Sequence, residues 1–156
     1  MSNQNANLER LRRLDCCALS DALDRLQIQG VATGLPQFAG TGRISGQAIT
    51  VKLGTGAPPE GKPRHLCCTA IEAGSRDHII VVEQRTGIDA GSWGGLLSLG
   101  AKQQGIAGVI ADGPVRDIDE ARELSFPVFA RSLTSRTARG RIVEQGTNMP
   151  VQLGEL

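Results

Sequence analysis

The sequence predicts one α/β domain, in which the strands of a partly parallel sheet alternate with helices. Compact apolar runs typical of buried strands recur along the chain, and helical segments with apolar residues every three or four positions separate them. The length of 156 residues suits one domain and is short of two. We therefore expect a single domain over residues 1–156, with a helical segment at 8–28 and an α/β core at 40–156.

The first expected element is helical and covers residues 8–28. Its leucines and alanines recur at spacings of three and four, and charged side chains occupy the opposite face. Ser20 and Asp21 are candidate caps for a second helix after a break near the first cysteine pair. Glycines and a proline between residues 30 and 36 end the helical structure.

Strands and helices alternate through the rest of the chain. β-Branched alternation predicts a strand at about 44–53, and a compact apolar run predicts a buried strand at 79–82. Residues 112–114, Asp-Gly-Pro, indicate a turn. The other expected strands are 109–111 and 126–130, and the expected helices are 67–73, 96–104 and 117–124.

The composition argues against several functional classes. Seventeen basic and sixteen acidic side chains leave a formal charge of +1, which disfavours a broad surface for nucleic acid or anionic lipid. Three Phe, one Trp and no Tyr leave little aromatic surface for stacking bases. No apolar run reaches the ~18 residues of a membrane span, and the polar N-terminus lacks the apolar core of a signal peptide. We expect a cytoplasmic protein that binds neither nucleic acid nor membrane.

The cysteines and histidines are expected to have structural roles. The four cysteines form the adjacent pairs 16–17 and 67–68, a spacing that seldom lets both side chains reach one tetrahedral ion. Small buried hydrophobic side chains are the favoured interpretation, and a redox or metal role is the alternative. His65 and His78 are isolated in the sequence, so a structural role is favoured for each.

Residues 56–63 have the G-x4-G-K spacing of a phosphate-binding loop, but their chemistry does not suit one. Such a loop binds phosphate through successive backbone N–H groups, and Pro58 and Pro59 have none. Pro63 stands where a hydroxyl would be needed for Mg²⁺. An exposed loop is the expected structure.

Two segments carry candidate site chemistry. Residues 91–95, Gly-Ser-Trp-Gly-Gly, open a helix, and unpaired N–H groups at a helix N-terminus can bind an anion. Residues 112–117 follow a strand, and ligands of α/β folds bind at the carboxyl ends of strands. There Arg116 can hold a carboxylate or enolate oxygen with its planar fork, and Asp117 can ligate a hard divalent cation. A glycine turn used for packing and a surface Arg–Asp pair are the structural alternatives.

Six motifs occur in a fixed order along the chain. They are Ser20-Asp21-Ala22-Leu23, the segment 46–51, Asp77 before the run 79–82, the segment 93–97, the segment 108–117 and the segment 126–131. Together they resemble the RraA-like family, which includes the 4-hydroxy-4-methyl-2-oxoglutarate aldolases. The resemblance covers roughly residues 8–153, and Asp-Gly-x-Val-Arg-Asp is its most telling motif. It implies a swivelling β/β/α-type domain that assembles as homotrimers or hexamers.

The resemblance also implies an activity and a set of site residues. It implies a metal-dependent (class II) aldolase that cleaves 2-keto acids through a pyruvate enolate, with Mg²⁺ or Mn²⁺ as cofactor. The substrates are 4-hydroxy-4-methyl-2-oxoglutarate or 4-carboxy-4-hydroxy-2-oxoadipate, and oxaloacetate decarboxylation is a further activity of the same enolate chemistry. Arg116 is then the catalytic residue that contacts the pyruvyl portion, and Asp117 ligates the metal. The substrate carboxylate binds Arg116 and the backbone amides of Gly94, Gly95, Leu96 and Leu97.

Two departures from the family pattern support an alternative hypothesis. Aldolases of this type often have an acidic residue in the loop where this chain has Gly95, and family members continue through further strands where this chain stops at Leu156. The domain is therefore expected to be short at its C-terminus. The alternative is a non-catalytic regulator that binds a ribonuclease and inhibits RNA turnover. The sequence does not identify the residue that acts as the proton-transfer base.

Overall fold

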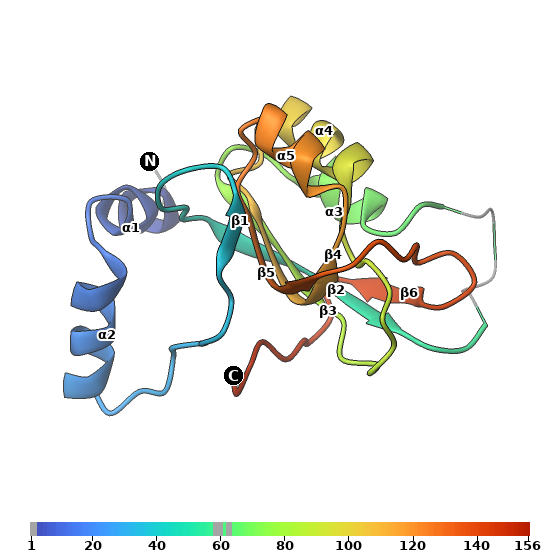
Figure 1. The fold of residues 1–156 in the computed structure, drawn as a ribbon. Helices are drawn as coiled ribbons and strands as arrows, with labels where there is room; N and C mark the ends of the chain where they lie inside the picture. The colour runs from blue at the N-terminus through green and yellow to red at the C-terminus, as the bar shows by residue number, and fades with distance from the viewer. Residues whose placement is uncertain (1–2, 58–60, 62–63) are drawn as a thin grey trace.

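A mixed sheet of six strands, in the order β1-β5-β4-β3-β2-β6, organises the computed structural model, which describes residues 3–57, 61 and 64–156 (Figure 1). The strands β2, β3, β4 and β5 are parallel to one another, and β1 and β6 pair antiparallel at the two edges. The strands are β1 (Gln37–Ala39), β2 (Gln47–Gly54), β3 (His78–Glu83), β4 (Val109–Val115), β5 (Val128–Leu133) and β6 (Val143–Thr147). The expected α/β class is confirmed.

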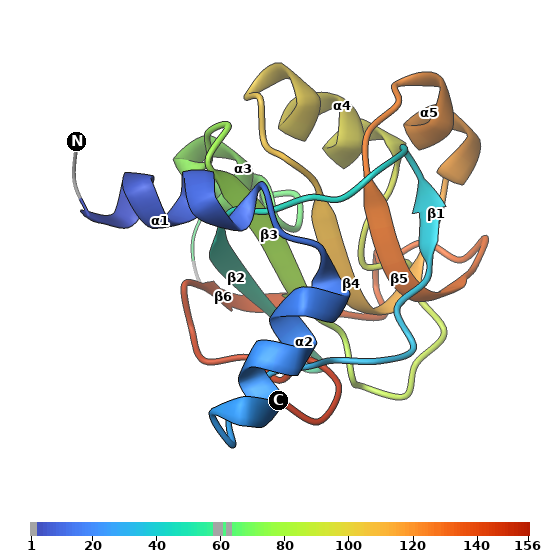
Figure 2. The same cartoon turned by 90° about the vertical axis from the view of Figure 1, so that its left-hand side faces the viewer.

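The helices form two groups. Three of them, α3 (Cys68–Ala73), α4 (Gly95–Gln103) and α5 (Ile118–Glu123), lie together on one face of the sheet (Figure 1). The other two, α1 (Asn3–Leu11) and α2 (Cys16–Arg25), stand apart from that group at the left of Figure 1, and Figure 2 is viewed from their side. The helix α2 has no buried residue. Within the described part of the chain, none of the helices combines the length and the apolar character needed to cross a bilayer.

The hydrophobic core lies between the sheet and the helices α3 to α5. Its strand residues are buried valines and isoleucines of β2 to β5, such as Val51, Ile80 and Val109. The largest buried side chains are Trp93 and Phe126, whose rings stack with centroids 6.2 Å apart. Burial of a large apolar side chain stabilises the fold by about 1.5–3 kcal/mol. This packing fixes the loop that leads into α4, because Trp93 belongs to that loop.

The N-terminal segment contains two helices, and the break between them falls near the first cysteine pair, as expected. The break falls between residues 11 and 16, and Asp15 caps α2 by accepting a hydrogen bond from the Ala18 amide at 2.8 Å. The expected cap at Ser20 is therefore wrong, and Ser20 lies inside α2. An aspartate that satisfies a free amide of the first turn sets the start of a helix. Arg12, in the break, reaches Asp77 at 2.8 Å and so ties the segment to the start of β3.

The turn expected at residues 112–114 is wrong, because β4 continues through Val115. Gly113 allows a close approach of the chain, since a Cβ atom there would lie 2.7 Å from the Gln84 carbonyl oxygen. The pairing of β4 with β5 shifts register between Ala111 and Pro114, so the missing N–H of proline falls at an irregularity of the ladder. The extension carries the strand directly to Arg116.

The short edge strands β1 and β6 had no signal in the sequence, because neither contains a compact apolar run. The burial expected for all four cysteines is wrong for one pair: Cys16 and Cys17 are exposed, whereas Cys67 is buried and Cys68 half-buried. Of the exposed loop expected at residues 56–63, residues 58–60 and 62–63 lie outside the described residues.

Candidate functional site

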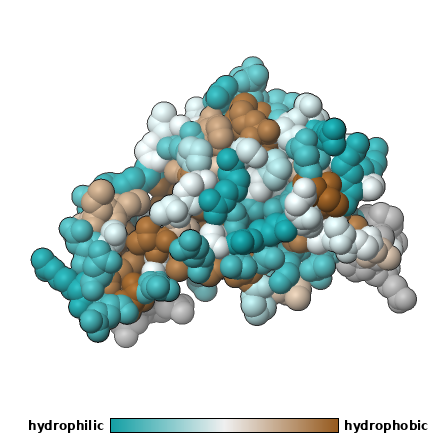
Figure 3. Space-filling view, turned by 60° about the horizontal axis from the view of Figure 1, so that its bottom comes forward, coloured by the Kyte–Doolittle hydropathy of each residue, from teal (hydrophilic) through white to brown (hydrophobic). Residues whose placement is uncertain are grey.

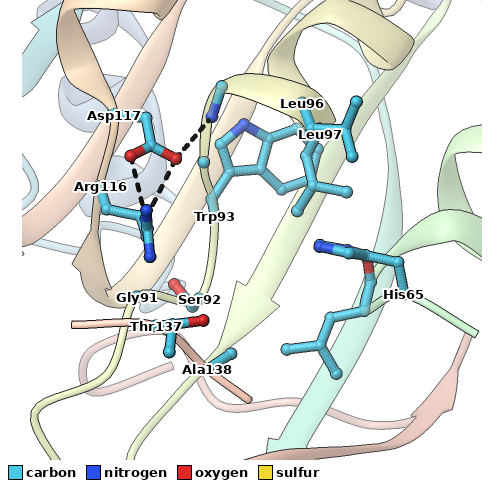
Figure 4. Close-up of a pocket in the computed structure, with 13 residues that line it drawn as sticks. His65, Gly91, Ser92, Trp93, Leu96, Leu97, Arg116, Asp117, Thr137 and Ala138 are labelled. Carbon is cyan, nitrogen blue, oxygen red and sulfur yellow. Dashed lines mark hydrogen bonds and ion pairs between the residues drawn. The ribbon is translucent and has the colours of Figure 1, made fainter. Parts of the chain in front are cut away.

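A pocket of about 200 Å³ lies where the start of α4 meets the chain after β4 (Figure 4). Four segments line it: residues 65–66 before α3, residues 91–97 at the start of α4, residues 116–117 after β4, and residues 137–138 before β6. All of the site residues expected from the sequence, Gly94, Gly95, Leu96, Leu97, Arg116 and Asp117, are among the lining residues.

Backbone hydrogen bonds hold the two central segments together. The Ser92 amide and the Ser92 hydroxyl each donate to the Pro114 carbonyl at 2.8 Å. The Arg116 amide donates to the Trp93 carbonyl at 2.9 Å. Because Trp93 is buried in the core, these contacts fix the backbone of Arg116 relative to the start of α4.

Arg116 and Asp117 form an ion pair at the wall of the pocket. The Arg116 Nε–H lies 3.0 Å from both carboxylate oxygens of Asp117, and Asp117 Oδ2 also accepts from the Gly95 amide at 3.3 Å. About a third of each side chain is exposed, at 34% and 31%. The Nη groups of Arg116 donate to no other described residue, so they are free to bind a ligand oxygen (Figure 4).

Asp117 has the left-handed backbone conformation, with φ of 53° and ψ of 41°. Aspartate tolerates this conformation better than most residues, although it still costs energy, and such residues cluster at functional sites. Asp117 is the residue before the first turn of α5, but its carboxylate makes no capping hydrogen bond to that helix. The carboxylate lies against the start of α4 instead, where it accepts from the Gly95 amide.

The glycines of the loop leave room for this pair. A Cβ atom at Gly91 would lie 2.8 Å from Arg116 Cγ, and one at Gly94 would lie 2.8 Å from Asp117 Oδ2. Contacts this short do not occur between real side chains, so a larger residue at either position would displace the pair. The glycine-rich loop therefore does more than pack the helix, because it lets the ion pair lie against the backbone.

Glu120 fills the space where a side chain at position 95 would stand. A Cβ atom at Gly95 would lie only 1.7 Å from Glu120 Oε2 and 2.5 Å from its Cδ atom. A carboxylate of α5 thus occupies that space, while Glu120 itself is exposed and is not among the residues that line the pocket. The signal was the spacing: Glu120 follows Asp117 by three positions, which puts both on one side of a helical turn.

The first turn of α4 offers backbone donors to the pocket. The first intrahelical bond runs from the Ser98 amide to the Gly94 carbonyl at 3.0 Å, so the amides before Ser98 have no acceptor within the helix. The Gly95 amide bonds to Asp117, which leaves the amides of Leu96 and Leu97 for an anion. Their position next to Arg116 suits a carboxylate.

His65 is one of the pocket residues whose position the sequence did not reveal, together with Leu66, Thr137 and Ala138. Its ring enters from the side opposite Arg116 and Asp117 (Figure 4). His78, by contrast, bonds to Ser75 Oγ at 2.9 Å and is not among the pocket residues. No sequence pattern links residue 65 to residue 116, because only the fold brings the two segments together.

The carboxylates beside the pocket suit a hard divalent cation that keeps most of its water. No group of three or more His, Cys, Asp or Glu side chains capable of holding a metal occurs among the described residues. Mg²⁺ is commonly held by one or two carboxylates, with water completing its shell. Asp117 has about four acceptor positions. Since Arg116 and Gly95 use up to three of them, Oδ1 retains one for a cation.

The fold and the pocket define an α/β protein in which the start of a helix and an Arg–Asp pair line one pocket. A family model described as RraA-like, Aldolase/RraA, matches residues 16–156, and the chain belongs to this family. The resemblance noted in the sequence is thereby confirmed.

Two sequence relatives and one crystal structure illustrate what this chain is similar to. It is 26% identical over 148 residues to DlpA of Legionella pneumophila, covering 94% of this chain and 24% of that protein. It is 26% identical over 151 residues to a Halalkalibacterium halodurans protein named "Putative 4-hydroxy-4-methyl-2-oxoglutarate aldolase", covering 94% of this chain and 66% of that protein. The crystal structure of Streptomyces coelicolor RraAS2, described as an unusual member of the RNase ES inhibitor RraA protein family, superposes with a TM-score of 0.81 at 21% identity. That match covers 96% of this chain and 75% of the other. The chain thus spans about a quarter of DlpA and about two thirds of the Halalkalibacterium protein.

Proposed function

We propose that this chain acts as a divalent-metal-dependent carbon–carbon lyase in the cytoplasm. Its substrates would be 2-keto acids that bear a second carboxylate, namely 4-hydroxy-4-methyl-2-oxoglutarate or 4-carboxy-4-hydroxy-2-oxoadipate, with oxaloacetate decarboxylation as a further activity. The observation that carries the proposal is the pocket in which the free Nη groups of Arg116 lie beside Asp117 and the first turn of α4.

The substrate carboxylate next to the keto group binds the amides of Leu96 and Leu97. The adjacent keto oxygen then faces the guanidinium of Arg116. As the carbon–carbon bond breaks, negative charge develops on this oxygen, and a fixed cationic donor stabilises that charge more than it stabilises the neutral ketone. The carboxylate of Asp117 fixes the plane of the guanidinium through its bonds to Nε.

Asp117, with Glu120 beside it, would hold the Mg²⁺ or Mn²⁺ ion. When bound, such an ion supplies Lewis-acid polarisation of the keto oxygen. Asp117 therefore has two tasks in the proposal, since it orients Arg116 and offers an oxygen to the cation. The Glu120 carboxylate, which occupies the space beside Gly95, supports the presence of a second acidic group near Asp117.

We also propose that the chain forms trimers or hexamers. Five of the large exposed hydrophobic side chains lie within one short stretch of sequence: Leu11, Leu14, Leu26, Ile28 and Val31. Figure 3 shows apolar surface on the left-hand side, where α1 and α2 lie. A contiguous apolar surface of this kind is typical of an interface. The regulator hypothesis, by comparison, is supported by likeness of fold alone, which does not define a function.

The test is pyruvate release from oxaloacetate and from 4-hydroxy-4-methyl-2-oxoglutarate in the presence of Mg²⁺. The proposal expects turnover of at least one substrate, measured continuously with a pyruvate-consuming coupling enzyme. Inhibition of a ribonuclease without pyruvate release from either substrate would instead favour the regulator.

A further inference from the structure

We propose that His65 is the proton-transfer residue of the pocket, with Nε2 as the atom that accepts the proton of the substrate 4-hydroxyl. The inference rests on the proposed lyase function and adds the group that aldol cleavage requires. Breaking the bond between C3 and C4 turns the hydroxyl at C4 into a carbonyl, so a base must remove the hydroxyl proton.

The hydrogen bonding of His65 leaves Nε2 with a lone pair. His65 Nδ1 lies 3.1 Å from the Leu66 carbonyl oxygen. A carbonyl oxygen can only accept, so Nδ1 carries the proton in this contact, and whenever the ring is neutral Nε2 is the acceptor. The contact with Leu66 thus favours the tautomer that a base needs.

The chain next to His65 is firmly anchored. Cys67 is buried and has a left-handed backbone with φ of 64°. Its amide donates to Glu144 Oε2 at 2.7 Å, and its thiol lies 3.9 Å from the Ser92 carbonyl oxygen. These contacts tie the segment that carries His65 both to β6 and to the loop of the pocket. Although the His65 side chain is exposed, its backbone is therefore positioned for catalysis.

The other polar side chains lining the pocket are poor bases. Arg116 has no acceptor atom, and the Trp93 indole is a donor only. The Ser92 hydroxyl is used in its bond to Pro114. Thr137 has no base beside it among the lining residues. Asp117 accepts from Arg116 and Gly95, and its remaining acceptor position is assigned to the cation in the proposed function. His65 is therefore the lining side chain suited to proton transfer within the described chain.

The charged groups around His65 come from its own segment and from three other parts of the chain. Arg64, on the same segment, pairs with Glu72 of α3, and Glu144 of β6 bonds to the amide of Cys67. Arg116 and Asp117 face His65 across the pocket (Figure 4). The Arg116 cation would hold the keto end of the substrate, so the C4 end extends toward His65.

The aldol cleavage transfers one proton to His65 and later returns it to the enolate. The hydroxyl proton moves to Nε2, the C3–C4 electron pair moves to form the C2–C3 double bond, and the negative charge arrives on the keto oxygen beside Arg116. For 4-hydroxy-4-methyl-2-oxoglutarate, the C4 fragment leaves as pyruvate. The imidazolium then returns its proton to C3 of the enolate, which gives a second pyruvate and neutral His65.

Oxaloacetate provides the discriminating comparison. Its C–C bond breaks with loss of CO₂, and no hydroxyl proton has to be removed. The resulting enolate can take its proton from water. Both reactions need Arg116, whereas the aldol cleavage alone needs a base at C4.

The experiment measures kcat/KM for both substrates in the full chain carrying His65→Ala. We expect aldol cleavage to fall by a factor on the order of 10²–10⁴, the usual contribution of a general base. Oxaloacetate decarboxylation should stay close to the wild-type value. Added imidazole should restore part of the cleavage activity in His65→Ala and none in Arg116→Lys. His78→Gln is the matched control, because it alters an imidazole outside the pocket.

Three results would overturn the assignment. Unchanged aldol cleavage in His65→Ala would exclude His65 as the base, and equal loss of both reactions would indicate a role in binding or folding, with circular dichroism reporting the fold. A selective loss of aldol cleavage in Glu120→Gln but not in His65→Ala would assign the base to Glu120. If the wild-type chain released no pyruvate from either substrate, the proposed function itself would fail, a result distinct from the other three.

Discussion

At the residue scale, Arg116 and Asp117 depend on each other. Asp117 accepts the Nε–H of Arg116 on both oxygens, which leaves the Nη groups for a ligand. A lysine at position 116 would keep the charge but present a compact ammonium without the planar fork. The geometry of the arginine, rather than its charge alone, is what the proposed mechanism uses.

Arg116→Lys should lower kcat/KM for oxaloacetate by a factor on the order of 10²–10³, comparable to loss of one oxyanion donor. The melting temperature should change little, since the side chain is a third exposed and lies outside the core. Steady-state kinetics and a thermal melt check the two expectations together. Wild-type kinetics in this variant would show that the guanidinium fork has no part in turnover.

Asp117→Asn should act through the metal. Asparagine tolerates the left-handed backbone of position 117, so the fold should persist. The neutral amide is a weaker ligand for Mg²⁺, so activity should fall at low Mg²⁺ and return in part as the concentration rises. A titration of activity against Mg²⁺ measures the shift in the half-saturating concentration. A loss of activity that no amount of Mg²⁺ reverses, in a folded variant, would contradict the assignment of Asp117 as the metal ligand.

At the element scale, Asp112 connects β4 to three other parts of the chain. Its carboxylate, 5% exposed, accepts from Arg131 of β5, from Arg85 after β3 and from the amide of Gly154. Burial raises the pKa of Asp112, whereas the hydrogen bonds from Arg131 and Gly154 and the charges of Arg131 and Arg85 lower it. Since the lowering effects together outweigh burial, the pKa lies below its ordinary value. The charged form is therefore the one that stabilises the fold.

This lowered pKa of Asp112 gives a stability that depends on pH. Its contribution should be complete above the unfolded-state value of about 3.9 and should be lost as the pH falls through the lower folded-state value. Asp112→Asn should cost about 1–3 kcal/mol of unfolding free energy at pH 7 and should remove this part of the acid dependence. Urea unfolding at neutral and acid pH measures both effects.

The control for Asp112 is Asp89→Asn. Asp89 pairs with Arg136 at 3.4 Å, and both side chains are more than half exposed. An exposed pair contributes about 0–1 kcal/mol, so the control should have little effect on unfolding. Equal unfolding free energies for Asp112→Asn and the wild type at neutral pH would show that the Asp112 contacts do not stabilise the fold.

The sequence predicted the elements with strong local patterns and missed those that depend on distant partners. The apolar run at 79–82 lies inside β3, and the helix expected at 96–104 corresponds to α4. The Asp-Gly-Pro turn failed because the strand partners of β4, not its local sequence, determine where the strand ends. The same reason explains the site: Arg116 and Asp117 were found from their motif, whereas His65 reaches the pocket only through the folding of a distant segment.

At the scale of the whole molecule, the N-terminal helical segment leaves large apolar side chains exposed in the single chain. No residue of α2 is buried, and the exposed fractions of Leu26 and Ile28 are 67% and 52%. A helix with an apolar face needs a partner to cover it. The proposed partner is another copy of this chain.

Light scattering at micromolar concentration should therefore give the mass of a trimer or a hexamer. The double variant Leu26→Glu and Ile28→Glu should lower this mass while circular dichroism stays unchanged, because both side chains are exposed in the single chain. A well-folded wild-type monomer at that concentration would contradict the assembly.

The central claim is that a divalent cation and the Arg116–Asp117 pair together drive carbon–carbon bond cleavage. The most direct measurement is pyruvate release from oxaloacetate after exhaustive treatment with a chelator, followed by addition of Mg²⁺ or Mn²⁺. The account predicts that chelation abolishes turnover, leaves the fold intact by circular dichroism, and is reversed by either ion. Full activity after chelation would contradict it.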